Sequence, residues 1–428
     1  MAELKQSYQL VVVGGGPAGL AAALSAAEQG VQDILLLERD SFLGGILPQC
    51  IHNGFGLEYF REELTGPEYA HRFIDRLSES PIQVQRETMV VDITESKEIY
   101  ALNRKQGIIK IKARAIVLAM GCRERTRGAI KVPGDRTAGV LTAGTAQRYI
   151  NIEGYIPGQK AIVLGSGDVG LIMARRMTLE GAEVESVLEI MPHSSGLVRN
   201  KVQCLDDFDI PLKLQHTITR IEGEKRVERV FVARVDKDFN PIPGSEYSVE
   251  CDTVLMAVGL IPENELSKNM GLKLDPVTGG PVTNEQRETE IEGVFACGNV
   301  LQVHDLVDYV TQEGEIVGQA VGQYLASRRK KRSSVVHMEA GENISYIVPH
   351  RLEFDYQKND KKIVKLFMRV TNPLEDVTIK IRDEQGKEVL SQDKSILVPG
   401  EMANISLPLV LVEDTVEKLK VSIEKGAD

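Results

Sequence analysis

The sequence predicts an α/β protein with two Rossmann-like dinucleotide-binding domains and a small C-terminal all-β sandwich. Two observations predict the α/β part: a strand, a Gly-x-Gly-x-x-Gly turn and a helix follow one another near the start, and the same pattern returns about 150 residues later. A third predicts the sandwich, since short strands of alternating polarity fill roughly the last ninety residues. A chain of 428 residues has room for two or three domains.

The first pattern is "YQLVVVGGGPAGLAAALSAAEQG". The continuous apolar run at 10–13 predicts a buried strand, and the small residues at 18–29 predict a helix that Gly30 can end. A second strand, "DILLLE", ends in Glu38, twenty-four residues after Gly14.

Each residue of this pattern has a physical role. Gly14 allows a tight turn, Gly16 lets the backbone approach a pyrophosphate, and Gly19 lets the helix and strand pack closely. The helix N-terminus offers N–H groups to phosphates, and Glu38 is placed to accept hydrogen bonds from a ribose.

The second pattern is "QKAIVLGSGDVGLIMARRMTLEGAEVESVLE". Its glycines are Gly165, Gly167 and Gly170, and the next strand ends near Glu189, again twenty-four residues after the first glycine. One copy alone could be a glycine turn in an ordinary α/β unit, but two matched copies predict two dinucleotide sites.

Three further segments fit the same architecture. Two strands are expected to end in "AMG" at 119–121 and "AVG" at 257–259, and "VFACGN" predicts a strand that ends before Gly298 and Asn299. A helix is expected to follow from about Tyr309.

These motifs resemble the two-dinucleotide-binding flavoprotein superfamily, the FAD- and pyridine-nucleotide-dependent oxidoreductases of thioredoxin-reductase type, over roughly residues 8–328. The resemblance implies that the first glycine turn binds FAD, the second binds NAD(P)H, and the "CGN" box holds the flavin ribityl chain. The family usually has aspartate where Asn299 stands; asparagine still accepts a hydrogen bond but brings no charge.

The resemblance implies a first part of the FAD-binding domain at 1–127, an NAD-binding domain at 128–261 and a second FAD-binding part at 262–330. The alternating strands predict the β-sandwich at 331–428. The expected FAD-binding residues are Gly14, Gly16, Pro17, Ala18, Gly19, Glu38, Arg39, Gly44, Gly45, Asn53, Val90, Ala119, Gly121, Gly298, Asn299 and Val310. The expected NAD-binding residues are Gly165, Gly167, Asp168, Val169, Gly170, Glu189 and Gly259.

More narrowly, "GGILPQCIHNGFG", "GPEYAHRF" and "GCRERTRGAIKVPGDRTAGVLTAGTAQRYIN" resemble NAD(FAD)-dependent dehydrogenase subunits associated with glycerol-3-phosphate dehydrogenase-like complexes. Nucleotide-binding subunits of amine, opine and proline oxidising complexes are more distant relatives. This resemblance implies partner subunits that carry a second redox centre, and an oligomer.

Glu189 favours NAD(H) over NADP(H). A carboxylate at this place accepts a hydrogen bond from a free 2′-hydroxyl and repels a 2′-phosphate, and the next residues, "IMPHSSG", contain no arginine.

The cysteines argue against thiol and metal chemistry. All five are far apart, without a CxxC pair or a cluster with histidine, which fits a reducing compartment and predicts no metal site. A disulfide reductase needs two thiols, and only Cys50 follows the Gly44-Gly45 pair. Cys50, His52 and His304 are catalytic candidates; the alternatives are a packed or polar-loop cysteine and hydrogen-bonded loop histidines.

Charge and hydropathy exclude other classes. The net charge of −11 argues against nucleic-acid binding. The basic run at 327–334 is interpreted as a solvated linker, with a targeting or nucleic-acid patch as the alternative. The apolar stretch at 10–27 contains three consecutive glycines and a proline, so we expect no membrane span and a soluble, cytoplasmic protein.

In the tail, alternating apolar positions predict three strand faces, formed by Val364, Leu366, Met368 and Val370, by Val377, Ile379 and Ile381, and by Leu419, Val421 and Ile423. We expect a docking or oligomerisation module, or else a stabilising appendage.

Together these features predict an FAD-dependent, NAD(H)-linked oxidoreductase. Hydride passes between nicotinamide and flavin without a side-chain acid or nucleophile. Because no resident thiol pair or metal acceptor is expected, electrons should pass to or from a partner subunit. Two alternatives stay open: a self-contained NADH oxidase or diaphorase that uses oxygen or a quinone, and a flavin-bound structural subunit without nicotinamide activity.

Overall fold

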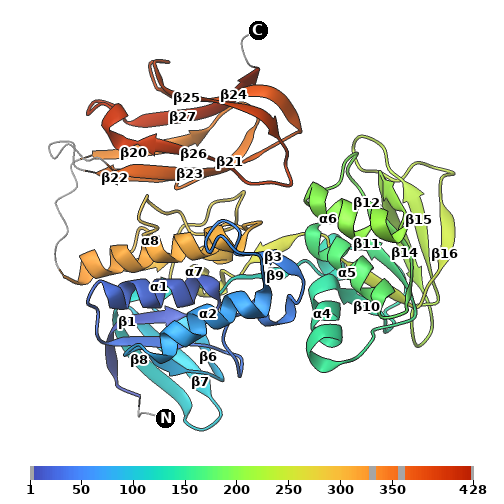
Figure 1. The fold of residues 1–428 in the computed structure, drawn as a ribbon, viewed down its shortest axis with the longest axis horizontal. Coiled ribbons are helices and arrows are strands. Elements are labelled where there is room, and N and C mark those ends of the chain that lie inside the picture. Colours follow the sequence, from blue (N-terminus) through green and yellow to red (C-terminus); the bar gives the residue numbers. More distant parts are fainter. Residues whose placement is uncertain (1–3, 327–333, 355–361, 426–428) are drawn as a thin grey trace. The chain divides into compact units, whose positions relative to one another are not determined.

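The computed structural model describes residues 4–326, 334–354 and 362–425. The chain divides into two compact units, one formed by Met1–Cys122 with Pro262–Asp428 and the other by Arg123–Ile261 (Figure 1). Residues 327–333 of the basic run lie outside the described residues.

The first unit contains a seven-stranded sheet in the order β5-β2-β1-β8-β7-β6, with β19 also paired to β8. Its strands β1, β2, β5 and β19 run parallel to their neighbours, whereas β6, β7 and β8 form an antiparallel meander. The strands are β1 (Ser7–Val13), β2 (Ile34–Leu37), β5 (Gln83–Gln85), β6 (Thr88–Ile93), β7 (Glu98–Asn103), β8 (Gly107–Leu118) and β19 (Val294–Ala296).

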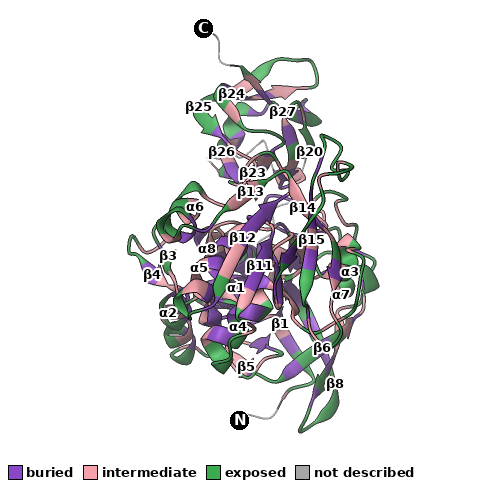
Figure 2. Ribbon diagram, turned by 90° about the vertical axis from the view of Figure 1, so that its right-hand side faces the viewer, coloured by how far each residue is buried: buried purple, intermediate pink, exposed green. Residues whose placement is uncertain are grey.

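Two helices of this unit, α1 (Pro17–Glu28) and α8 (Val307–Leu325), pack closely together. The contact requires glycines on α8, because a Cβ on Gly314 would lie 2.4 Å from the carbonyl oxygen of Ala18. A Cβ on Gly318 would lie 2.5 Å from the Cβ of Ser25. Buried residues of both helices belong to one hydrophobic core, and both ribbons carry the colour of buried residues in Figure 2. The structure begins α8 two residues before the expected Tyr309.

Helix α2 (Gly66–Ser78) also belongs to this unit, and its capping box is formed by Thr65 and Glu68. Shorter elements of the unit are β3 (Asn53–Phe55), β4 (Leu64–Thr65) and α7 (Glu265–Asn269).

The second unit is built on a five-stranded parallel sheet in the order β10-β17-β11-β12-β13. Its strands are β10 (Val140–Thr142), β11 (Lys160–Leu164), β12 (Glu183–Glu189), β13 (Leu212–Leu214) and β17 (Thr253–Met256). Its helices are α3 (Arg127–Ile130), α4 (Ala143–Arg148), α5 (Asp168–Leu179) and α6 (Val198–Cys204). An antiparallel sheet adds β14 (His216–Glu222), β15 (Arg229–Arg234) and β16 (Tyr247–Glu250). The linkers β9 (Cys122–Glu124) and β18 (Leu260–Pro262) pair with each other.

The C-terminal region forms the predicted all-β sandwich. One sheet has the order β22-β20-β27-β24-β25 and the other β21-β23-β26. The strands are β20 (Ser334–Ala340), β21 (Ile344–Val348), β22 (Arg351–Phe354), β23 (Ile363–Val370), β24 (Leu374–Asp383), β25 (Glu388–Leu397), β26 (Ala403–Pro408) and β27 (Lys418–Lys425). The three predicted strand faces are confirmed, since all ten residues are buried. The sandwich is not wholly antiparallel, because β20 and β27 pair in parallel.

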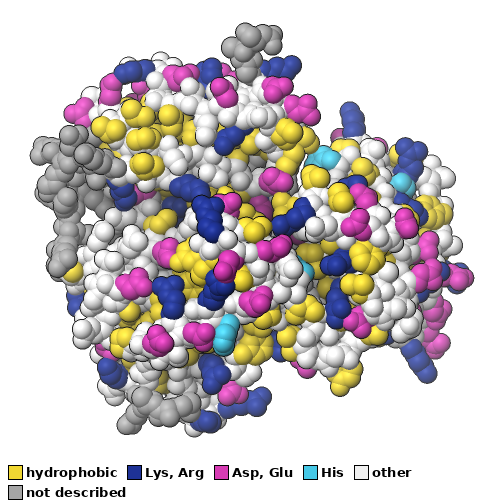
Figure 3. Space-filling model, in the orientation of Figure 1, with side chains coloured by type: hydrophobic (Ala, Val, Ile, Leu, Met, Phe, Trp, Pro, Cys, Tyr) yellow, Lys and Arg dark blue, Asp and Glu magenta, His cyan; other side chains and the backbone are white. Residues whose placement is uncertain are grey.

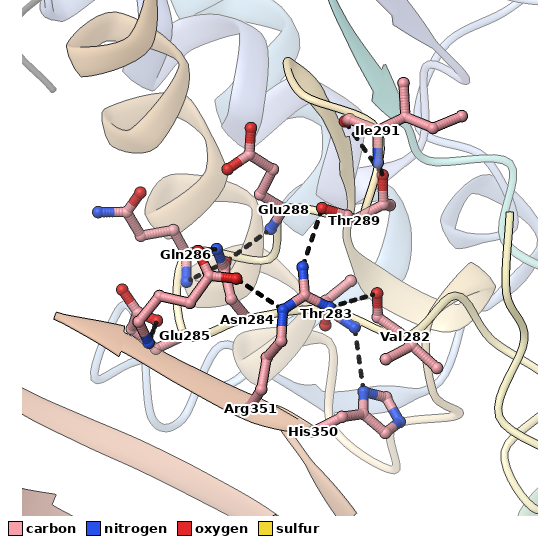
Figure 4. A network of polar contacts seen from close by, with 11 residues as sticks. Val282, Thr283, Asn284, Glu285, Gln286, Glu288, Thr289, Ile291, His350 and Arg351 are labelled. Carbon is pink, nitrogen blue, oxygen red and sulfur yellow. Dashed lines mark hydrogen bonds and ion pairs between the residues drawn. The ribbon is translucent and has the colours of Figure 1, made fainter. Parts of the chain in front are cut away.

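The sandwich contacts the segment 282–291 of the same unit (Figure 4). Arg351 Nη2 donates to the carbonyl oxygen of Thr289 at 3.0 Å, and the backbone N–H of Thr283 donates to His350 Nδ1 at 3.1 Å. Burial lowers the pKa of His350 to about 4, so the ring is neutral at neutral pH and can accept this bond.

Acidic and basic side chains are interspersed on the face of the molecule drawn in Figure 3. Within the described ranges, the longest helices are too short or too polar to cross a bilayer.

Candidate functional site

The first glycine turn follows β1 and leads into α1. Gly14 has φ 107°, and a Cβ there would lie 2.3 Å from the carbonyl oxygen of Ala119. A Cβ on Gly19 would lie 1.9 Å from the carbonyl oxygen of Gly14. Both positions therefore need glycine, which brings α1 and the end of β8 close to the turn.

The N-terminus of α1 has the features of a phosphate site. Gly16 is its N-cap, no side chain caps it, and its first turn holds no acidic residue. Pro17 stands at the first helical position and Ala18 is buried. Backbone N–H groups at this end are thus available to an anion, and a Cβ on Gly16 would meet only Gly45, at 3.7 Å. These residues fit a pyrophosphate.

Glu38 follows β2 and is buried beside the turn. Its Oε2 accepts from the backbone N–H of Gly15 at 2.8 Å, and its Oε1 accepts from the N–H of Asp40 at 2.7 Å. The neighbouring Arg39 is exposed. The structure therefore brings Glu38 to the turn, as expected for a ribose acceptor.

The Gly44-Gly45 pair lies against the same turn. The N–H of Gly44 donates to the carbonyl oxygen of Gly15 at 2.8 Å, and a Cβ on Gly45 would lie 3.0 Å from the Cα of Gly16. Two segments that are about thirty residues apart in the sequence thus form one loop cluster.

The "CGN" box also reaches this cluster. Gly298 has φ 74°, and a Cβ there would lie 2.8 Å from the Cβ of Ala18. Asn299 Nδ2 lies 3.5 Å from Cys122 Sγ, and Asn299 Oδ1 accepts from the N–H of His304 at 3.0 Å. The asparagine thus has contacts of its own within the loops, and its contact with a ribityl chain stays a prediction.

A buried charge cluster supports the box. Glu313 on α8 accepts from Arg287 Nε at 2.7 Å and from the N–H of Gly298 at 2.8 Å, and lies 3.2 Å from His304 Nε2. The His304 side chain is fully buried, which favours the structural alternative for this histidine over proton handling at a flavin.

The N-terminus of α8 is also without a side-chain cap. Asp308 in its first turn is buried and accepts from the N–H of Tyr59 at 3.1 Å; burial raises the pKa of Asp308. Thr311 shares a hydrogen bond of 2.7 Å with Tyr69, and Val310, the residue before Thr311, is buried. The contact of Val310 with a flavin stays a prediction.

The remaining FAD candidates are placed as follows. Val90 is a buried residue of β6, and Asn53 is exposed at the start of β3. Gly121 follows β8 with φ 73°. Their contacts with a flavin stay predictions.

Cys50 does not have the surroundings of a reactive thiol. Its Sγ donates to the carbonyl oxygen of Ile46 at 3.4 Å, and burial raises the pKa of Cys50 to about 12. The His52 ring packs against that of Phe55, with centroids 4.9 Å apart and the ring planes tilted by 36°. All five cysteines are free, and burial raises the pKa of Cys204 to about 11 and of Cys251 to about 12. Burial also raises the pKa of Cys297.

The second turn repeats the first in the other unit. A Cβ on Gly165 would lie 2.1 Å from the carbonyl oxygen of Ala257, and one on Gly170 would lie 2.6 Å from the carbonyl oxygen of Gly165. Gly167 is the N-cap of α5, again without a side-chain cap. Gly259 has φ 98° after β17.

Two predicted residues at the start of α5 differ in their surroundings. Val169 is half-buried. Asp168 Oδ1 accepts from the N–H of Leu197 at 2.8 Å and from Asn200 Nδ2 at 2.7 Å. Asp168 therefore anchors the loop after β12, a role that the motif alone does not suggest.

Glu189 is buried at the end of β12, next to this turn. Its carboxylate accepts bonds from Ser166 and Ser195, two residues that the motif pattern did not single out. A position-by-position comparison of the two glycine turns, which sets Ser166 against Gly15, would have identified the first of them.

Among the described residues, no group of three or more histidine, cysteine, aspartate or glutamate side chains is arranged to hold a metal ion.

Known proteins share this architecture. The model of the pyridine nucleotide-disulphide oxidoreductase family matches residues 8–323. The hydrogen cyanide synthase subunit HcnB of Pseudomonas protegens is 27% identical over 62% of this chain and 60% of its own length. An opine oxidase subunit of Agrobacterium tumefaciens is 23% identical over 69% of this chain and 62% of its own length. The chain thus spans about three fifths of these two relatives.

Among solved structures, thioredoxin reductase of T. acidophilum superposes with a TM-score of 0.61 at 23% identity, over 76% of this chain and 100% of that one. This likeness concerns the fold alone. The family model, by contrast, covers most of the chain and both glycine turns. It confirms the predicted fold class, the oxidoreductase class and the use of FAD and a pyridine nucleotide. The chain belongs to the pyridine nucleotide-disulphide oxidoreductase family.

Proposed function

We propose that the chain is an FAD-dependent, NAD(H)-linked oxidoreductase that passes electrons between NAD(H), FAD and a redox centre on a partner subunit. One observation carries the proposal: two matched glycine turns, each beside a buried glutamate at a strand end, occur in a chain whose five cysteines are all free.

The residues of the first unit would hold FAD. The uncapped N-terminus of α1 suits its pyrophosphate, Glu38 suits a ribose, and the Gly44-Gly45 loop and the "CGN" box border the same turn. When bound, FAD supplies hydride chemistry at its ring. The protein's part is to bind and orient, and no side-chain nucleophile is required.

The second unit would bind NAD(H). Its turn precedes the uncapped N-terminus of α5, and Glu189 is placed to accept from a ribose hydroxyl. A buried carboxylate there would repel the 2′-phosphate of NADP(H).

A partner as electron acceptor or donor follows from the thiols and from the relatives. Thiol–disulfide exchange needs a thiolate and a second thiol. Cys50 has its pKa raised to about 12, and the sequence places no second cysteine near it. Two relatives are subunits by name, of a hydrogen cyanide synthase and of an opine oxidase. We extend the proposal to a dehydrogenase complex of glycerol-3-phosphate type, on the resemblance of the "GGILPQCIHNGFG" region, with the sandwich as a docking module.

The test has two parts. The protein is purified from its own host with whatever accompanies it, and its cofactors are determined. The protein alone is then mixed with NADH in a stopped-flow instrument. We expect bleaching of the flavin band, slow NADH consumption with oxygen, and faster turnover when the co-purified partner is added. Fast oxygen consumption by the protein alone would favour a self-contained oxidase, and absence of bleaching would favour a structural subunit.

The nucleotide preference is tested separately. Glu189→Ala should weaken NADH binding more than NADPH binding, because only NADH offers the 2′-hydroxyl. Glu183→Ala is the matched control, since Glu183 is exposed on the same strand. Equal losses for both nucleotides would contradict the ribose assignment.

A further inference from the structure

The two glycine turns make the same backbone contacts with their acids. In each, the second residue of the turn and the residue two positions after the acid donate N–H bonds to the carboxylate. The four bonds are Gly15 N to Glu38 Oε2 (2.8 Å), Asp40 N to Glu38 Oε1 (2.7 Å), Ser166 N to Glu189 Oε2 (3.0 Å) and Met191 N to Glu189 Oε1 (2.9 Å).

The two acids differ in what else they accept. Glu189 Oε2 also accepts from the hydroxyl of Ser166 at 2.5 Å and from that of Ser195 at 3.0 Å. Within the described part of the chain, Glu38 receives no hydroxyl hydrogen bond. Burial does not explain the difference, because Glu38 is 6% and Glu189 is 4% exposed.

The difference in hydroxyl bonds arises from the second residue of each turn and from the loop after each acid, which returns to the turn. Gly44 and Ser195 each stand six residues after their acid, and each donates its backbone N–H to the second residue of its turn. The acceptor is the carbonyl oxygen of Gly15 at 2.8 Å in one case and Ser166 Oγ at 2.9 Å in the other. The first site thus has glycines at both positions where the second has serines.

A carboxylate has about four acceptor positions. Glu189 accepts four hydrogen bonds from described residues, three of them on Oε2 and one on Oε1, whereas Glu38 accepts one on each oxygen. We propose that Ser195, with Ser166, determines the affinity of the second site, because these hydroxyls bond to Oε2 of Glu189 and compete there with the ribose hydroxyls of NAD(H). This inference rests on the proposed function of the second unit.

Binding of the nucleotide would then displace Ser195. The displacement is feasible because Ser195 is exposed, whereas Ser166 is fully buried. The bonds of Asp168 to Leu197 and Asn200 hold the far end of the loop in place. Glu189 must exchange a serine hydroxyl for a ribose hydroxyl, which suits a nucleotide that binds and leaves at each turnover. Glu38 has acceptor positions to spare, which suits an FAD that stays bound.

The experiment measures the dissociation constants of NADH and of ADP-ribose by isothermal titration calorimetry, with the FAD-loaded protein. Ser195→Ala is the test variant, since it removes the hydroxyl and keeps the backbone N–H bond to Ser166. Ser194→Ala is the matched control, because Ser194 Oγ has no hydrogen-bond partner among the described residues. The pair Glu189→Ala and Glu189→Ala/Ser195→Ala tests whether the effect passes through Glu189.

We expect S195A to bind both ligands about three- to tenfold more tightly, the effect of one net hydrogen bond, and S194A to stay within about twofold of the unchanged protein. In the E189A background, the S195A change should have no effect. Unchanged or weaker binding by S195A would overturn the inference while leaving the proposed function intact, provided that NADH binds and E189A weakens it. If neither ligand binds to any variant, the proposed function and the inference both fail.

Discussion

Replacing Glu313 with glutamine tests whether a buried charge cluster holds the first unit together. Arg287 is 1% exposed, and Glu313 is the one carboxylate within 4 Å of its guanidinium among the described residues. Glutamine keeps the size of the side chain and one acceptor but removes the charge, so Arg287 stays buried without its counter-ion. Breaking a buried ion pair in this way costs about 3–5 kcal/mol. We expect E313Q to lower the free energy of unfolding by that amount, out of a total of about 5–15 kcal/mol.

The assay is urea unfolding followed by circular dichroism, with Glu315→Gln as the matched control. Glu315 lies two residues further along α8, is half-buried and accepts a hydrogen bond from Tyr59 Oη, which glutamine can still accept. We expect the control to cost less than about 1 kcal/mol. A loss of less than about 1 kcal/mol for E313Q at neutral pH would refute the reasoning.

The effect should also depend on pH with a defined sign. Burial alone would raise the pKa of Glu313, but Arg287 and His304 outweigh burial and lower it to about 2, from an ordinary value of 4.5. Stabilisation by the ionised carboxylate is therefore complete above about pH 4.5 and lost as the pH falls toward 2. The difference between E313Q and the unchanged protein should shrink across this interval, and a difference that stays constant would count against the ion pair.

Three other predictions concern the first unit. Gly14→Ala should abolish FAD retention, because its Cβ would collide with a backbone carbonyl oxygen. Gly30→Ala (φ 88°, nothing within 4 Å) should keep FAD and cost only about 1 kcal/mol of unfolding free energy. Flavin absorbance of the purified variants measures retention, urea unfolding measures the cost, and equal FAD loss in both variants would contradict the reasoning. Cys50 should react slowly with iodoacetamide at neutral pH, since its pKa is raised to about 12. Cys50→Ser should keep the rate of flavin reduction by NADH within about twofold of that of the unchanged protein, and a tenfold loss of rate would show that the thiol is catalytic. Asp305→Asn should expose the sandwich to proteolysis, because Asp305 pairs with Arg369 and accepts from the N–H of Met402 at 2.7 Å; an unchanged cleavage rate would show that the contact is dispensable.

The elements that could be predicted are those whose signal is local. A strand, a glycine turn and a helix occupy about twenty consecutive residues, so Gly14 and Gly165 were found from spacing alone, and the structure shows the close contacts that require them. The alternating faces of the sandwich were likewise readable, because a strand with one buried face has a period of two. The parallel pairing of β20 with β27 could not be predicted in this way, since it joins strands about eighty residues apart.

The charge cluster around Glu313 illustrates why the roles of some site residues cannot be predicted from local sequence patterns. Arg287, His304 and Glu313 belong to three different segments, and each alone reads as a polar residue on a loop or helix. Only the fold places all three in the interior, where an ion pair supports the "CGN" box through the N–H of Gly298.

The two acids, Glu38 and Glu189, show a subtler limit. Spacing identified both, and it described them as equivalent, because each follows its first glycine by twenty-four residues. What a carboxylate can bind depends on the acceptor positions that its neighbours leave, and those neighbours are the second residue of the turn and the loop that returns to it. Glycines stand at both positions in the first unit and serines in the second. The same motif therefore produces one acid with a single hydrogen bond on each oxygen and one whose Oε2 already accepts from two hydroxyls. A motif therefore locates a candidate nucleotide site, and we infer that the residues around its acid, one on the turn and one on the return loop, set how firmly the nucleotide is held.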